Sequence, residues 1–253
     1  MNTTTIIINV SERFPNYSQR NNEIDSANVC GPTNFIQGLV YSGWYWDDAV
    51  VPRFKQPEDK LTFFCRTNKE VLAYYDKHYH NMYANWMREA KQKAAVLGKE
   101  YWEVSCSVAY PPNEVHDVMS YAANLFIGYT AAELAKMDQR PVTRFFNSFS
   151  ERAVLSSLIE RGLPVISSVD PFHKGGGHYV TIVGVELEGD FMKSGDLNKV
   201  KSYIIDNTYG RFDFERQQYE AISGNNEVIS REKFLNIVKP VSHYFSQGAA
   251  CCC

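Results

Sequence analysis

Three apolar runs rich in β-branched residues follow one another at short intervals in the second half of the chain. They span residues 163–169, 179–185 and 202–205, and the segments between them include the turn 170–171 and the polar loop 189–198. Apolar runs with β-branched residues and bounding turn residues are typical of strands. The turn and the polar hairpin loop between successive runs favour antiparallel neighbours, because such connections join antiparallel strands. We therefore expect a mainly antiparallel sheet.

Helical patterns come before these strands. Apolar residues recur at helical spacing over 31–43, over the long segment 68–97 and over 151–161, and a glycine stands at or just after the end of each. Helices followed by an antiparallel sheet indicate an α+β fold. We expect one domain, residues 1–253, with a helical insert at about 50–150.

Cys30 lies in the run Cys30-Gly31-Pro32-Thr33, directly at the start of the first predicted helix. Unpaired N–H groups and the helix dipole lower the pKa of a cysteine at a helix N-terminus, and the thiolate is the nucleophilic form. Pro32 is compatible with the first turn, where its missing N–H costs nothing. Cys30 is therefore a candidate nucleophile. The alternative is a small buried hydrophobic residue, as most free cysteines are.

Two later positions supply partners for such a nucleophile. His178 follows the glycine run 175–177 and opens a predicted strand, which would hold it as a general base. Asp206 ends the next strand, and antiparallel pairing would bring it beside His178, where it can fix the imidazole tautomer. Asn207 is the alternative, because alternation along a strand lets only one of the two side chains face His178. On other interpretations His178 caps a strand edge and Asp206 belongs to an ordinary turn.

Catalysis by a cysteine also needs donors for the oxyanion. The backbone N–H of Cys30 is one candidate because it lies at a helix start. An upstream side-chain amide is the usual second donor. Gln19 is our first choice for it, with Asn22 and Asn28 as alternatives.

These residues resemble those of papain-like cysteine peptidases of the bacteriocin-leader-cleaving type, a group that includes phage and bacterial cell-wall hydrolases. The resemblance is carried by the segments Cys30–Thr33, Gly177–Gly184 and Ile205–Gly210. Upstream, Gln19-Arg20-Asn21-Asn22 is similar to a Gln-Arg-Asp-Asn pattern that precedes the cysteine in some phage-associated members. The resemblance covers about residues 15–45 and 160–240.

The resemblance implies a papain-like fold, with an N-terminal helix that carries the nucleophile packed on a C-terminal antiparallel sheet. It assigns Cys30 as nucleophile, His178 as general base, Asp206 as third member and Gln19 as oxyanion-hole donor. Two positions depart from the family pattern. Ile24 stands where leader peptidases commonly have a glutamine, and Asp206-Asn207 replaces the usual Asp-Pro. The choice between Asp206 and Asn207 as third member stays open.

The function implied is hydrolysis of an amide bond by a cysteine peptidase. The expected substrates are peptide crosslinks of peptidoglycan or, as the next choice, a protein or leader peptide. A third possibility is acyl transfer to an amine in place of hydrolysis, because the same catalytic residues can carry out both reactions. The alternative from a different class is a catalytically silent structural or binding component, for example of a phage particle, that retains the peptidase fold.

Composition narrows the partners. A net charge of −3 gives no bulk electrostatic case for nucleic acid. The sequence has no apolar run of transmembrane length, and its six cysteines lack metal-ligand spacing, so we expect no membrane span, metal or cofactor. Residues 1–10 do not resemble a signal peptide, which predicts cytoplasmic synthesis, with virion association or release at host lysis. The role of the Cys251–Cys253 tail and the oligomeric state are left open.

Overall fold

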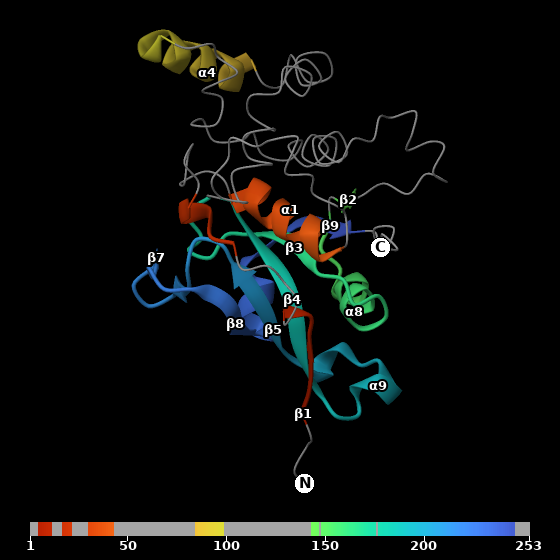
Figure 1. Ribbon diagram of the computed structural model, residues 1–253. Coiled ribbons are helices and arrows are strands. Elements are labelled where there is room, and N and C mark those ends of the chain that lie inside the picture. Colours follow the sequence, from red (N-terminus) through yellow and green to blue (C-terminus); the bar gives the residue numbers. More distant parts are fainter. Residues whose placement is uncertain are drawn as a thin grey trace, which may run out of the picture.

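The computed structural model describes residues 5–11, 17–21, 30–42, 84–98, 143–146, 148–175 and 177–245 (Figure 1). Within them the chain forms an α+β fold, as expected, with helices packed on a mostly antiparallel sheet. No helix among the described residues is long and apolar enough to cross a membrane. The predicted insert at about 50–150 lies largely outside these residues, which include only a helix and a strand of it.

The sheet has seven strands in the described part of the chain, and all of its pairings are antiparallel. Its order is β2-β9-β3-β4-β5-β8, and β1 pairs with the far half of β4. The strands are β1 (Thr5–Asn9), β2 (Thr143–Phe146), β3 (Val165–Val169), β4 (His178–Glu188), β5 (Val200–Asn207), β8 (Gly224–Ser230) and β9 (Val238–Phe245). The antiparallel arrangement predicted for β3, β4 and β5 is confirmed.

The helices of the described residues are α1 (Cys30–Tyr41), α4 (Ala84–Leu97), α8 (Glu151–Ile159), α9 (Phe191–Ser194) and α10 (Arg231–Ile237). Two of them, α1 and α8, begin and end within two residues of the predicted ranges 31–43 and 151–161; the helix predicted over 68–97 ends at Leu97, and its first part lies outside the described residues. The side chain of Ser150 accepts the N–H of Ala153 and caps α8, and Gly162 follows that helix with a φ of 62°. The loop 189–198 differs from the prediction, because α9 and the start of the 3-10 turn Leu197–Lys199 lie in it.

Helix α1 lies across one face of the sheet and packs on β4 and β3 (Figure 1). Its apolar residues Phe35, Ile36 and Leu39 are completely buried, as the helical pattern predicts, whereas Val40, expected on the same face, is 37% exposed. Gly38 brings the helix close to β9, because a Cβ at this position would lie only 2.1 Å from the ring of Phe245. Burial of this face holds the first turn of α1 over the start of β4.

The main apolar core lies on the opposite face of the sheet. Side chains of β3, β4 and β5 pack there with those of α8 and α10. Tyr203 and Phe234 are among the largest of them, with ring centroids 4.7 Å apart. The Tyr203 hydroxyl donates to Glu151, which also forms an ion pair with Arg231 at 2.8 Å. This pair joins the starts of α8 and α10 at the edge of the core.

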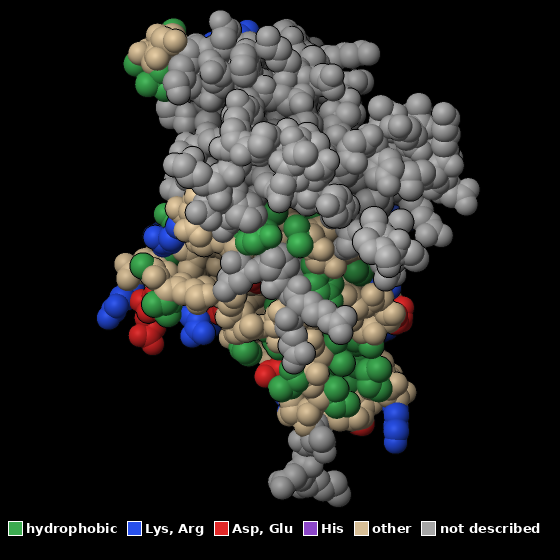
Figure 2. Space-filling view, in the orientation of Figure 1, with side chains coloured by type: hydrophobic (Ala, Val, Ile, Leu, Met, Phe, Trp, Pro, Cys, Tyr) green, Lys and Arg blue, Asp and Glu red, His purple; other side chains and the backbone are tan. Residues whose placement is uncertain are grey.

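The charged side chains are distributed over the surface. Figure 2 shows Lys, Arg, Asp and Glu side chains at the periphery of the described part, with hydrophobic side chains gathered between them. The face in view has no large patch of a single charge among the described residues. This distribution agrees with a net charge of only −3 for the whole chain.

Candidate active site

Cys30 is the first residue of α1, and its side chain is a partly exposed thiol. A 12-residue helix begins with it, so the thiol lies at the end of the helix where N–H groups lack intrahelical acceptors. Unpaired N–H groups and the helix dipole favour the thiolate. The local position predicted for a nucleophile is therefore present.

Asn34, one turn after Cys30, ties this helix end to the sheet. Its Nδ2 donates to the carbonyl oxygen of Cys30 at 2.7 Å and to that of Tyr179 at 3.0 Å, and the side chain is completely buried. Its Oδ1 accepts from the hydroxyl of Thr181. Because Tyr179 directly follows His178, these bonds hold the start of α1 over the start of β4. Sequence analysis missed Asn34, and its signal was an amide four residues after the cysteine in an apolar helix.

His178 begins β4 and is 7% exposed. Its Nε2 lies 2.8 Å from Oδ1 of Asn207. The backbone N–H of Tyr209 also donates to this oxygen, at 3.1 Å, which identifies it as an acceptor. Nε2 must then carry the imidazole proton, and Nδ1 keeps a lone pair. Asn207 thus fixes the tautomer of His178.

Burial controls the charge of this imidazole. Desolvation lowers the pKa of His178 to about 4, and the hydrogen bond to Asn207 opposes the shift. The ring is therefore neutral near pH 7 when no charged partner is beside it, which is the form that accepts a proton. A thiolate next to it would stabilise the imidazolium, so a cysteine and this histidine would titrate as a pair.

The expectation that Asp206 lies beside His178 is wrong. Asp206 pairs with Thr181 across β4 and β5, and its Oδ2 accepts from Nε2 of Gln37 at 2.8 Å, so it faces α1. Successive side chains of a strand point to opposite faces, and Asn207 therefore faces the other way, toward His178. Burial raises the pKa of Asp206 to about 7, against the hydrogen bond from Gln37. The carboxylate anchors the helix to β5.

Five buried residues thus form a polar seam between α1 and the ends of β4 and β5. They are Asn34, Gln37, Thr181, Asp206 and Thr208. Each is 3% exposed or less. Because buried polar groups are costly unless they are hydrogen-bonded, such a seam accepts few relative positions of helix and sheet.

Gln19 lies at the seam, and it is 1% exposed. Its backbone N–H donates to the carbonyl of Thr208 at 3.0 Å, and its Oε1 accepts from the hydroxyl of Thr208 at 2.9 Å. Nε2 is therefore the donor end of this amide, as an oxyanion donor requires. Asn22 and Asn28, the alternatives for this role, lie outside the described residues.

Aromatic side chains enclose His178. The rings of Tyr219 and Phe212 lie edge-on to the imidazole, with centroids 5.2 and 6.1 Å away. Both come from the hairpin of β6 (Phe212–Asp213) and β7 (Gln218–Tyr219). The pKa of Tyr219 is raised by burial and next by the charge of Cys30. Tyr219 thus lies edge-on to His178 and within electrostatic reach of Cys30.

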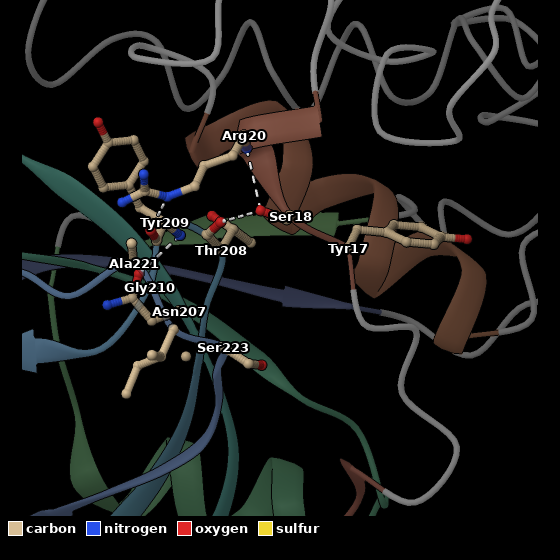
Figure 3. Close-up of a pocket in the computed structure, with 11 residues that line it drawn as sticks. Tyr17, Ser18, Arg20, Asn207, Thr208, Tyr209, Gly210, Ala221 and Ser223 are labelled. Carbon is tan, nitrogen blue, oxygen red and sulfur yellow. Dashed lines mark hydrogen bonds between the residues drawn. The ribbon is translucent and has the colours of Figure 1, made fainter.

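A cavity of about 300 Å³ borders this site on the side of Asn207 (Figure 3). Arg20 lies at its rim, where its Nε donates to the carbonyl of Tyr209 at 2.7 Å and its guanidinium stacks 4.2 Å from the centroid of the Tyr209 ring. The lining consists of Tyr17, Ser18, Arg20, Asn207, Thr208, Tyr209, Gly210, Ala221, Ile222, Ser223 and Gly224. Among the described residues of this lining, Arg20 alone carries a charged side chain.

Metal ligands do not gather in the described part of the chain, where no group of three or more His, Cys, Asp or Glu side chains could hold an ion. Cys65, Cys106 and the Cys251–Cys253 tail lie outside the described residues.

Comparison with known proteins agrees with the geometry. Residues 11–227 match the Peptidase_C39 like family, and this match spans both Cys30 and the strands with His178 and Asn207. It confirms the resemblance to papain-like cysteine peptidases and supports a cysteine peptidase kind of activity. No curated protein matches the chain. From its sequence and the matched segment, the chain belongs to the Peptidase_C39 like family, whose members are related to the papain-like cysteine peptidases.

Proposed function

We propose that the protein hydrolyses peptide bonds with Cys30 as nucleophile, His178 as general base and Asn207 as the residue that orients the base. The observation that carries this proposal is the bond between His178 Nε2 and Asn207 Oδ1 at 2.8 Å. It leaves Nδ1 as the basic nitrogen in a site that Asn34 ties to the first turn of α1. Asp206, expected first as the third member, takes no part in this assignment.

In the proposed reaction Nδ1 of His178 accepts the thiol proton of Cys30, and the sulfur attacks the carbonyl carbon of the substrate. The backbone N–H of Cys30 and Nε2 of Gln19 donate to the oxyanion. Nδ1 then gives the proton to the leaving amine, and the C–N bond breaks to leave a thioester. Water deprotonated by His178 hydrolyses the thioester and returns the thiol.

Peptide crosslinks of peptidoglycan are the substrate we favour. Support comes from the segment Gln19-Arg20-Asn21-Asn22, similar to the pattern of phage-associated relatives. This segment supplies both Gln19 and the rim of the cavity beside Asn207. A protein or leader peptide is the next choice. With a cell-wall substrate the protein would act after virion association or host lysis, which is part of the same proposal.

The test begins with alkylation of Cys30, because it needs no known substrate. The protein is treated with iodoacetamide near pH 7, and the modified peptides are mapped over time. We expect fast labelling at Cys30 that His178→Ala slows by about 10² or more, the usual contribution of a positioned base. Labelling of Cys30 no faster than Cys65 or Cys106 would contradict the proposal and favour the catalytically silent alternative.

Substrate assays then separate the two substrate classes. Purified peptidoglycan is incubated with the protein, and new amino groups are counted, with an unfolded protein as the parallel substrate. Cys30→Ala is the matched control for both. Release of amines from peptidoglycan alone would support the favoured substrate, and cleavage of the unfolded protein alone would replace it with the second. Addition of a free amine distinguishes acyl transfer, which would consume that amine.

A further inference from the structure

Among the buried side-chain atoms of the described residues that have no hydrogen-bond partner are two on the side of the sheet that Asn207 faces. They are Nδ2 of Asn207 and Oε2 of Glu227. The amide nitrogen is a donor without an acceptor, and the carboxyl oxygen is an acceptor without a donor, so the two could bond to each other. Buried groups left unsatisfied cost stability, and such pairs in a native fold need an explanation.

Glu227 occupies an inward position of β8. It is 8% exposed and lies opposite Ile205 of β5. Its side chain points to the same face of the sheet as that of the buried Ile229, two residues further along β8. Its Oε1 accepts from the backbone N–H of Phe212 at 3.0 Å, and the ring of Phe212 contacts His178. One carboxyl oxygen is thus fixed, and the other remains for a neighbour.

Asn207 presents its amide nitrogen on the side away from His178. Its Oδ1 already accepts from Tyr209 and His178, so Nδ2 points elsewhere. Strand β8 lies directly against this residue, because a Cβ on Gly224 would be 2.8 Å from the Cβ of Asn207. The strand that carries Glu227 is therefore in contact with Asn207.

The electrostatics of Glu227 agree with this proximity. Burial raises the pKa of Glu227 to about 7, and the Phe212 N–H, Arg211 and the Asn207 amide oppose the shift in that order, whereas Glu220 adds to it. The Asn207 side chain is thus near enough to favour the carboxylate. At pH 8 Glu227 is mostly ionised, which is the form that can accept a hydrogen bond.

We propose that the Glu227 carboxylate accepts a hydrogen bond from Nδ2 of Asn207 and so positions Asn207 as the acceptor for His178. Glu227 is then a positioning residue behind the three proposed catalytic residues. Without it, the Asn207 amide can rotate by half a turn and offer an N–H to His178 Nε2. The histidine would lose the tautomer that leaves Nδ1 basic. This role rests on the proposed function.

An exchange of hydrogen-bond polarity tests the contact. In Glu227→Gln the new amide keeps the Phe212 bond through its oxygen and turns an N–H toward Nδ2 of Asn207, donor against donor. In Asn207→Asp two carboxyl groups meet. The double variant restores one acceptor and one donor in reversed order, because the carboxylate placed at position 207 can accept from the amide placed at position 227 and still accept from His178. Iodoacetamide labelling of Cys30 at pH 8 is measured for all four proteins.

We expect each single variant to slow labelling about tenfold or more, and the double variant to be labelled faster than either single. Equal labelling rates for Glu227→Gln and the original protein would overturn the proposal. A double variant whose rate is reduced by the product of the two single-variant factors would also overturn it, because the two changes would then act independently. If a single variant is partly unfolded at the labelling temperature, its lowered thermal midpoint takes the place of the rate. The double variant must then regain the midpoint.

The ¹⁵N signals of the His178 ring give a readout that a purely structural role would not move. We expect the Nε2–H tautomer in the original protein and a shift toward Nδ1–H in Glu227→Gln. An unchanged tautomer in this variant counts against Glu227. If Cys30 of the original protein is not activated, the proposed function fails, but the tautomer shift still decides whether Glu227 positions Asn207.

Discussion

Different interactions attach the helices to the two faces of the sheet: apolar packing on one face and buried hydrogen bonds on the other. On one face the aliphatic and aromatic core beneath α8 and α10 includes Tyr203 and Phe234, both completely buried. On the other face the polar seam joins α1 to the ends of β4 and β5 through directed hydrogen bonds. Apolar contact is non-directional and scales with area, whereas a buried hydrogen bond demands a distance and an angle.

This contrast suggests that the apolar core mainly determines the free energy of unfolding, whereas the polar seam mainly determines the position of α1 on the sheet. The core supplies most of the burial that offsets conformational entropy, and a small displacement within it costs little contact. The seam adds less net energy but ties the start of α1, which carries Cys30, to β4 and β5. Displacements of about 1 Å can cost a reaction about 10²-fold. Changes in the core should therefore reduce the folded population, and changes near the seam should reduce reactivity in molecules that remain folded.

Phe234→Ala should show the largest effect, and it should be on stability alone. Removing a buried Phe side chain destabilises a protein by about 3–5 kcal/mol, through lost transfer energy and a residual cavity. Urea denaturation measures this loss. The labelling rate of Cys30, taken per folded molecule at low temperature, should stay within about twofold, in keeping with an interaction remote from the base. A tenfold slower rate would show that the two faces are not separable.

Asn207→Ala and Asp206→Asn form the sharpest pair, because the two residues are adjacent and face opposite sides. Asn207→Ala removes the acceptor of His178 and should slow Cys30 labelling by about 10², within the range of a lost positioned base. Asp206→Asn keeps an acceptor for Gln37 and should leave the labelling rate within about twofold, because the hydrogen bond to Gln37 is retained. The reverse order of effects would restore Asp206 as the third member.

Asn34→Ala should affect both properties. The change strands the buried carbonyl of Tyr179 and the hydroxyl of Thr181, which costs about 1–3 kcal/mol. It also frees the first turn of α1, so labelling of Cys30 should fall by more than the loss of folded protein explains. Asn34→Asp is the matched control, since it keeps an acceptor for Thr181 but not the donors. A normal rate in folded Asn34→Ala would mean that apolar packing alone places Cys30.

The pH dependence of stability should show the smallest effect. The pKa of Asp206 is raised from 3.8 to about 7, so the folded state binds more protons than the unfolded state between these values. Its contribution to stability therefore falls as the pH rises through this window. The pKa of His178 is lowered from 6.5 to about 4, and its contribution falls as the pH drops through that range.

Chemical denaturation of Asp206→Asn at pH 5 and pH 8 isolates the first of these terms. The stability of the variant relative to the original protein should be higher at pH 8 than at pH 5. His178→Gln should give the opposite slope, with a relative gain at pH 5. Parallel pH profiles for the original protein and Asp206→Asn would mean that this carboxyl group is not desolvated.

The sequence predicted which element each candidate residue lies on better than it predicted which of two adjacent residues faces His178. Local patterns predicted Cys30 at the start of a helix and His178 at the start of a strand, and the turn and hairpin loop between the strands predicted the antiparallel order of β3, β4 and β5. Asp206 and Asn207 both carried an acceptor, and alternation required that only one face His178. Which one it was depended on the register, which pairs Asp206 with Thr181.

What the sequence by itself determined, then, is the α+β class, the family and the residue types of a cysteine peptidase, because helical and strand periodicities and helix-end chemistry act over a few residues. The tertiary structure alone decided that Asn207 and not Asp206 meets His178 and that Asn34 ties α1 to β4. These contacts join residues 29 and 145 positions apart in the chain. Such pairings depend on strand register and on burial of the whole sheet, which no local pattern specifies.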